Sequence, residues 1–248
     1  VRRMLSQVGA PAADLWPVPS AELVRHLSAT SVDIQELVVD LAQQRDPSAR
    51  LMARLVELAP NRCAEDLALT LLGSEADIES GRAGETVHAA ARAGFRTIHF
   101  KSQMAMNPDS ATGFIDALGM VKDAVVIVSV PMHAHRAETY DMMMGSRPEG
   151  GHHANSIHNV RRLVRLSRST GDAVPGIPGL WVVPRITRQD AVYQEIEEFY
   201  DAWLMEAGAC VIDPLPAPRP GERIAPLPRP AWVDELEAAA SRRVQALH

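Results

Sequence analysis

The sequence predicts an α/β protein built around a parallel sheet. Five short apolar runs follow one another from about residue 66 onward, and most of them contain no alternating polar residues. A strand that is buried on both faces has this composition, which is typical of parallel sheets. Longer amphipathic stretches with helical spacing lie between the runs. Repeated strand–helix–strand units with right-handed crossovers form an open sheet or a full or partial (β/α) barrel.

The strands are expected in chain order. Val32–Leu41 is compatible with a first strand or with a helix, because its periodicity does not separate the two. Phe95–Phe100 is the later run that alternates apolar and polar residues. The full set of later strands is Leu67–Leu72, Phe95–Phe100, Val125–Val130, Leu180–Ile186 and Cys210–Ile212.

Local signals place helices between these strands. Gly94 and Gly208 each stand after a helical stretch and before a strand, as helix terminators do. Asn107-Pro108-Asp109 predicts a helix start, because proline fits the first turn. Apolar stripes of helical spacing are formed by Val160, Leu163, Val164 and Leu166, and by Val192, Ile196, Phe199 and Trp203.

Both ends of the chain differ from the middle. Residues 1–30 contain three prolines and are expected to form a helix and loops. Residues 31–213 are expected to form the β/α domain. Residues 214–248 form a Pro-rich extension, whose seven prolines up to residue 230 exclude regular helix or sheet there, followed by a terminal helix at Trp232–Leu247.

Composition excludes several classes of protein. The 248 residues are 46% hydrophobic and 23% charged, which is typical of a globular domain. The net charge of −6 argues against nucleic-acid binding. We found no apolar run long enough to span a membrane and no signal peptide, so we expect a cytoplasmic protein with no membrane partner. The two cysteines, Cys63 and Cys210, exclude a disulfide framework and any site that needs three thiolates from this chain.

Polar residues gather where the predicted strands end. In parallel α/β folds ligands bind at the carboxyl ends of the strands, so these residues predict a rim for a small anionic or zwitterionic ligand. The His133/His135 and His152/His153 pairs could suggest a metal site, but no later strand end supplies an obvious ligand set apart from Asp213, so we expect solvated loop histidines and no metal. The rim comprises Gly73, Ser74, Glu75, Asp77, Lys101, Ser102, Gln103, Ser129, His133, His135, Arg185, Thr187 and Asp213.

Four of these segments follow a recognisable order and spacing. In one known protein family the corresponding strand ends carry the motifs Gly-Gly-Glu-Pro and Thr-Asn-Gly. This chain has Leu71-Leu-Gly-Ser-Glu75 at the first position and Lys101-Ser-Gln103 at the second. Val126-Ile-Val-Ser129 is followed by His135-Arg-Ala-Glu-Thr-Tyr-Asp141, in place of ISLDG and ETYDRIRG. Over roughly residues 50–225 the chain therefore resembles the radical SAM superfamily, and within it the members with a SPASM-type C-terminal extension. Two departures are Ser74 and Pro131, which replace a glycine and an aspartate of the family pattern.

The resemblance implies a partial TIM-like (β/α) barrel that binds S-adenosylmethionine (SAM). Glu75 would contact the amino group of the methionine moiety, and Ser129 its carboxylate or the ribose. The positions implied for SAM are Gly73, Ser74, Glu75, Ser102, Ser129 and Arg185.

The family's chemistry needs a [4Fe–4S] cluster held by Cys-x3-Cys-x2-Cys after the first strand, with one iron left free for SAM. Between Val32 and Leu67 the chain has only Cys63, so it lacks the ligands for this cluster. No cysteine follows Cys210, where a SPASM extension would carry its own.

Three functional interpretations follow. The first is a cluster-less pseudoenzyme that binds a small molecule, a peptide or a catalytic protein partner. The second is a fragment of a true radical SAM enzyme, since the chain begins with Val1 and ends where a SPASM extension would begin. The third is a hydrolase of the (β/α)-barrel type that uses a metal at His133 and His135. Whether the chain is an enzyme stays open at this point.

Overall fold

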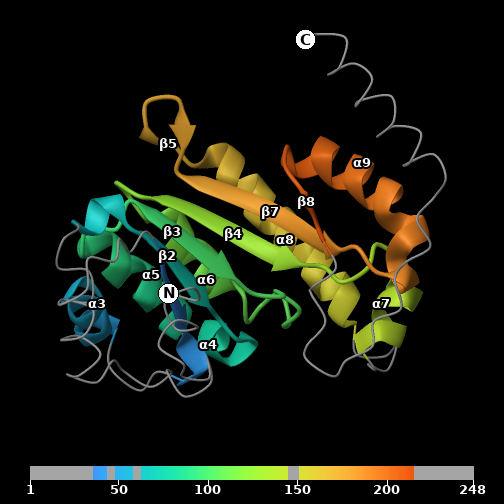
Figure 1. Ribbon diagram of the computed structural model, residues 1–248, viewed down its shortest axis with the longest axis horizontal. Coiled ribbons are helices and arrows are strands. Elements are labelled where there is room, and N and C mark those ends of the chain that lie inside the picture. The colour runs from blue at the N-terminus through green and yellow to red at the C-terminus, as the bar shows by residue number, and fades with distance from the viewer. Residues whose placement is uncertain (1–35, 44–47, 58–62, 145–150, 215–248) are drawn as a thin grey trace, which may run out of the picture.

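A computed structural model describes residues 36–43, 48–57, 63–144 and 151–214 (Figure 1). The predicted N-terminal segment 1–30 lies outside these residues, and so does the Pro-rich extension after Pro214 with its terminal helix. No helix within the described ranges is long and apolar enough to cross a membrane.

The core of the described structure is a six-stranded parallel sheet. Its strand order is β1-β2-β3-β4-β7-β8, and every neighbouring pair is parallel. The prediction of a parallel α/β fold is therefore confirmed, with β1 and β8 at the two edges of the sheet. The strands are β1 (Glu36–Asp40), β2 (Ala68–Leu72), β3 (Thr97–Lys101), β4 (Val125–Pro131), β7 (Leu180–Thr187) and β8 (Val211–Asp213).

The ambiguous segment Val32–Leu41 contributes strand β1, and its last residue, Leu41, begins a short 3-10 helix. A separate antiparallel pair, β5 (Asp172–Val174) and β6 (Ile177–Pro178), lies between the long helix His152–Ser169 and β7. Strand β3 starts two residues later than the predicted run Phe95–Phe100 and ends one residue later, because Lys101 still pairs with Ser129.

The helices connect the strands in the expected alternation. They are α3 (Ser48–Glu57), α4 (Glu75–Glu79), α5 (Arg82–Arg92), α6 (Thr112–Gly119), α7 (Ala137–Met144), α8 (His152–Ser169) and α9 (Ile196–Ala207). Three short 3-10 helices are η2 (Leu41–Gln43), η3 (Ala64–Asp66) and η5 (Asp190–Glu195).

Glycine and asparagine determine several helix limits. Gly94 and Gly208 both have positive φ, at 98° and 76°, which confirms them as helix terminators. The prediction of a helix start at Asn107 is wrong, because α6 begins at Thr112. The Asn107 side chain instead accepts a hydrogen bond from the Asp109 backbone N–H at 2.9 Å, which closes a turn ahead of the helix.

The two faces of the sheet have different environments. Alternate residues of β2, β3 and β4, such as Leu71, Phe100 and Val128, are fully buried. The Phe100 ring lies 4.7 Å from that of Phe114 on α6, and Figure 1 shows α5, α6 and α8 behind the sheet. Helices therefore cover this face, and burial of its apolar side chains is the main stabilising contribution. The opposite face is lined by the intervening residues, which are mostly half-buried.

Candidate functional site

Three polar pairs bridge neighbouring strands on the face opposite the helices. Thr70 on β2 donates to Glu36 on β1 at 2.6 Å. His99 Nε2 on β3 lies 2.5 Å from Ser129 Oγ on β4. Each pair joins residues that are diagonal neighbours in the register, a position from which longer side chains reach one another.

The third pair continues this pattern at β7 and β8. Arg185 Nε donates to Asp213 at 2.9 Å, and its Nη2 donates to the other carboxylate oxygen. This bidentate contact raises the pKa of Arg185. The three pairs together form a polar band across the sheet, and we call this surface the polar sheet face.

His99 is uncharged at neutral pH on this face. Burial, followed by the nearby positive charges of Lys101 and Arg185, lowers the pKa of His99 to about 4, while Glu36 opposes the shift. A neutral imidazole can either accept the Ser129 hydroxyl proton or donate to its oxygen, depending on the tautomer. The Ser129 side chain, which the sequence analysis proposed as a ligand contact, is therefore oriented by His99.

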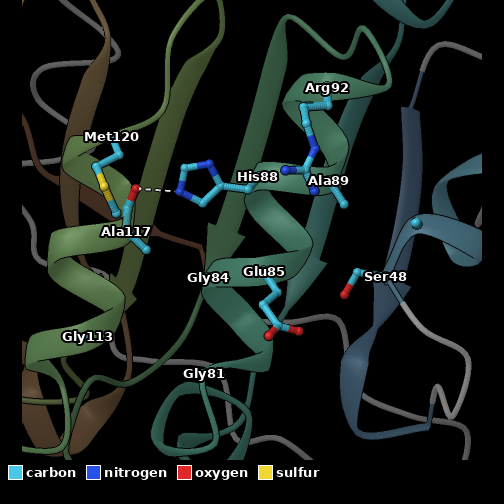
Figure 2. Close-up of a pocket in the computed structure, with 11 residues that line it drawn as sticks. Ser48, Gly81, Gly84, Glu85, His88, Ala89, Arg92, Gly113, Ala117 and Met120 are labelled. Carbon is cyan, nitrogen blue, oxygen red and sulfur yellow. Dashed lines mark hydrogen bonds between the residues drawn. The ribbon is translucent and has the colours of Figure 1, made fainter.

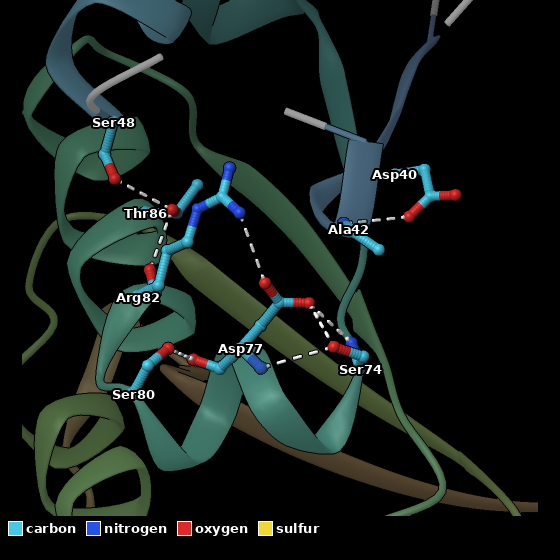
Figure 3. Close-up of polar contacts among 8 residues, drawn as sticks. All are labelled: Asp40, Ala42, Ser48, Ser74, Asp77, Ser80, Arg82 and Thr86. Carbon is cyan, nitrogen blue, oxygen red and sulfur yellow. Dashed lines mark hydrogen bonds and ion pairs between the residues drawn. The ribbon is translucent and has the colours of Figure 1, made fainter. Parts of the chain in front are cut away.

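The segment Gly73–Glu75 lies where expected, directly after β2. Gly73 N–H donates to the Lys101 carbonyl at 3.0 Å, and a Cβ at Gly73 would lie 2.3 Å from the Phe100 ring. Glycine is thus required there by the close approach of an aromatic ring. Ser74 is the N-cap of α4, and its side chain and backbone form a capping box with Asp77 (Figure 3).

Asp77 has a structural role in the same cluster. Its other carboxylate oxygen accepts a hydrogen bond from the Arg82 guanidinium at 3.4 Å, which links the start of α4 to the start of α5 (Figure 3). Glu75 is half-buried and influences a different element: burial first, and then the charge of Glu75, raises the pKa of Tyr140 on α7. The Glu75 carboxylate is therefore the group of this segment that is not used by the α4 cap.

The loop between β3 and α6 is held in place by side chains of α8. Ser156 Oγ donates to the Gln103 carbonyl at 2.8 Å. Asn159 Nδ2 donates to the carbonyls of Met104 and Met106, at 2.9 and 3.0 Å. Arg162 donates to the Pro108 carbonyl at 2.6 Å. These side chains donate to backbone carbonyl groups that are not paired within a strand or a helix. They thereby fix a loop at the carboxyl edge of the sheet.

Ser102 begins this loop and faces away from the polar sheet face. Its side chain is 6% exposed, and its hydroxyl accepts a 3.4 Å hydrogen bond from the Met104 backbone N–H. The structure thus places Ser129 and Arg185 on the polar sheet face, Gly73–Glu75 at its edge, and Ser102 beneath it. Thr187, which was also predicted, is half-buried at the end of β7, beside Asp213 in the register.

The histidines of the predicted rim have separate environments. His133 Nε2 lies 3.1 Å from the Gln103 amide nitrogen, and burial lowers the pKa of His133. The His135 ring packs edge-on against Phe199. The expectation of a solvated loop histidine is wrong for His153, which lies on α8 and is buried next to Tyr140, and burial lowers its pKa. In the described part of the chain, no three His, Cys, Asp or Glu side chains are grouped closely enough to hold a metal ion.

Glu195 is a buried, hydrogen-bonded carboxylate that was not predicted from the sequence. It is 3% exposed and accepts the backbone N–H groups of His135 and Arg136, both at 2.9 Å, and the Thr139 hydroxyl. Burial would raise the pKa of Glu195, but the hydrogen bonds from Thr139, Arg136 and His135 outweigh it, so its pKa is lowered. Glu195 thus caps the start of α7 from a distant segment, which no local motif could reveal.

Sequence reasoning also missed His99, Thr70 and Glu36, because it considered only residues at strand ends. A signal was present in the alternation of Phe95–Phe100, which indicates a strand with two different faces. Thr97, His99 and Lys101 share one of these faces, and Ile98 and Phe100 share the other.

The two cysteines do not match the cluster site that the resemblance implies. Cys63 is exposed and precedes β2, and Cys210 immediately precedes β8, with its thiol 3.7 Å from the Tyr200 carbonyl. Both therefore lie on the amino side of the sheet, ahead of two strands that are separated by β3, β4 and β7. These thiols cannot share one cluster, whose ligands would have to lie together at the carboxyl edge.

A groove of about 550 Å³ lies on the other side of the molecule, between α3, α5 and α6 (Figure 2). Small residues of α5, such as Gly84, form its floor, and His88 Nε2 lies 2.9 Å from the Ala117 carbonyl in its wall. None of the rim residues predicted from the sequence lines this groove.

Comparisons with known proteins return no matching family model, no matching curated relative and no matching solved structure.

Proposed function

We propose that the chain is a radical-SAM-like partial (β/α) barrel that binds a small zwitterionic ligand, with SAM as the first candidate, and has no cluster chemistry of its own. The observation that carries the proposal is the polar sheet face. A parallel sheet whose strands follow chain order turns alternate side chains from every strand toward one surface. On this surface Ser129 and Arg185 come from neighbouring strands, and Glu75 lies at the carboxyl edge.

The proposed contacts suit a ligand that carries both charges. The Glu75 carboxylate would bind an ammonium group. The Ser129 hydroxyl would bind the carboxylate or the ribose of that ligand. A fold does not by itself establish a function, so the proposal depends on these side chains and not on the barrel alone.

The absence of a cluster site limits the chemistry that we propose. Reductive cleavage of SAM needs three thiolates, and this chain contains two cysteines, which precede two separated strands. Binding would therefore serve recognition, either of the ligand itself or of a peptide or catalytic protein partner that the bound ligand helps to recruit.

Calorimetric titration of the full chain with SAM tests the proposal. We expect saturable binding with one ligand per chain, weakened by Glu75→Ala. Glu79→Ala is the matched control, because Glu79 lies one turn further along the same helix and is exposed. Equal binding by the two variants, or no saturable binding, would contradict the proposal.

Anaerobic incubation with iron and sulfide tests the proposal that the chain has no cluster chemistry of its own. We expect no stoichiometric iron–sulfur absorption band and no cleavage of SAM. A stoichiometric band accompanied by SAM cleavage would instead show that the chain assembles a cluster and acts as an enzyme.

A further inference from the structure

Lys101 occupies a central place on the polar sheet face. It lies on β3, two residues from His99 and beside Ser129 in the register, so all three side chains point to the same side. The other cation of this face, Arg185, is neutralised by its bidentate contact with Asp213. Among the residues that the structure describes, no carboxylate forms an ion pair with Lys101. The Lys101 charge is thus available to an external anion.

An apolar strip adjoins this charge on the same face. Ile127 on β4 and Trp181 on β7 are register partners, and Val183 follows two residues after Trp181. The Trp181 side chain is 41% exposed, although it belongs to an interior strand of the sheet. An exposed indole next to other apolar side chains is a surface that favours contact with a ring or an aliphatic chain.

The strip and the lysine are close enough for one small molecule to contact both. Trp181 and Lys101 are separated by two strand spacings and two residues, which corresponds to roughly 12 Å between their Cα atoms. Both side chains project from the same side of the sheet, so a small molecule lying on this face can contact both.

We infer that this part of the polar sheet face binds a small aromatic carboxylate, with its ring on Trp181 and Ile127 and its carboxylate on Lys101. Charge complementarity selects the anion, since Lys101 is a cation beside the neutral His99 and Ser129 pair. The apolar strip selects the ring, because a carboxylate without one would leave Trp181 in water. This inference goes beyond the proposed function and does not depend on SAM binding, because Glu75 takes no part in it.

Titration of the full chain with 2-naphthoate tests the inference, with binding followed by calorimetry. We expect saturable binding at low-millimolar concentrations or below. The uncharged analogue 2-naphthamide should bind about tenfold more weakly, because it lacks the charge that pairs with Lys101. Acetate, which lacks the ring, should show no saturable binding in the same range.

Matched variants then assign the site. The chain has two lysines, so Lys122→Met is a control for Lys101→Met with the same change in charge. We expect about tenfold weaker naphthoate binding for Lys101→Met and for Trp181→Ala, and unchanged binding for Lys122→Met. Thermal unfolding of each variant shows whether it is folded.

Three results would overturn the inference. They are no saturable naphthoate binding to the full chain, equal binding of naphthoate and naphthamide, and equal affinities for folded Lys101→Met and Lys122→Met. If Trp181→Ala does not fold, Trp181→Leu replaces it, and it should bind the ring more weakly for the same reason.

Discussion

At the scale of single residues, the pairing of His99 with Ser129 shows how a half-buried strand position acquires unusual chemistry. The imidazole is partly removed from water and faces Lys101 and Arg185, so the charged form is disfavoured. In the unfolded chain the same side chain returns to an ordinary pKa of about 6.5. This difference links protonation of His99 to folding.

We predict that His99 makes the protein less stable in mild acid. Between about pH 6.5 and pH 4 only the unfolded chain takes up the proton, so stability falls as the pH falls through this window and is constant above it. Because His99 is partly exposed, we expect a loss of about 1–2 kcal/mol and not the full value of the shift. Urea unfolding at about pH 7.5 and about pH 5 measures this loss, which should be smaller in His99→Gln. An equal loss in both proteins would contradict the role of His99.

A second residue-scale prediction concerns Glu195. Glu195→Gln keeps the size of the side chain but removes the charge that holds the His135 and Arg136 N–H groups and the Thr139 hydroxyl. We expect the free energy of unfolding to fall by about 1–2 kcal/mol. The exposed Glu197, two residues further on, supplies the control Glu197→Gln, which should change it by about 0.5 kcal/mol or less. Equal effects in urea unfolding would show that Glu195 is not a cap.

At the scale of elements, α8 acts as a support for the loop between β3 and α6. Its polar residues Ser156, Asn159 and Arg162 all project toward that loop and donate hydrogen bonds to carbonyl groups along it. Two of the three are fully buried, which is uncommon for polar side chains and is explained by these hydrogen bonds. The loop conformation therefore depends on a helix that begins about 50 residues later in the chain.

We predict that Asn159→Ala loosens this loop without unfolding the sheet. The variant leaves the carbonyls of Met104 and Met106 without a donor, so amide hydrogen exchange of the loop should become faster. Asn155→Ala is the control, because Asn155 makes a single longer contact of 3.4 Å to Ala105. Exchange that is unchanged in Asn159→Ala, or equally fast in both variants, would contradict the role of Asn159.

The elements also show what a sequence can predict. Apolar runs located β2, β4, β7 and β8 to within one residue at each end, because a strand buried in a sheet must be apolar. The start of α6 was misplaced, because an Asx turn at Asn107 uses the same residues as a helix start. Glu195 and the α8 support could not be predicted, since both depend on contacts between segments distant in sequence.

At the scale of the whole molecule, the central feature is a sheet with two different faces. Uninterrupted apolar runs predicted burial on both sides, but the described structure covers one side with helices and lines the other with polar pairs. The prediction of burial on both sides was wrong because the polar sheet face also carries apolar side chains, such as Ile127 and Val183, which are half-buried.

Two consecutive valines on β7 provide a direct test of this asymmetry. Val182 is 3% exposed on the helix-covered face, whereas Val183 is half-buried on the polar sheet face. The substitutions Val182→Ala and Val183→Ala remove the same two methyl groups from the same strand, so strand propensity cancels between them. We expect Val182→Ala to cost about 2 kcal/mol of unfolding free energy in urea, and Val183→Ala less than about 1 kcal/mol, because only the first leaves a cavity in a packed core. Equal costs would mean that the polar sheet face is packed as tightly as the core, and a ligand could then not reach Lys101 or Trp181.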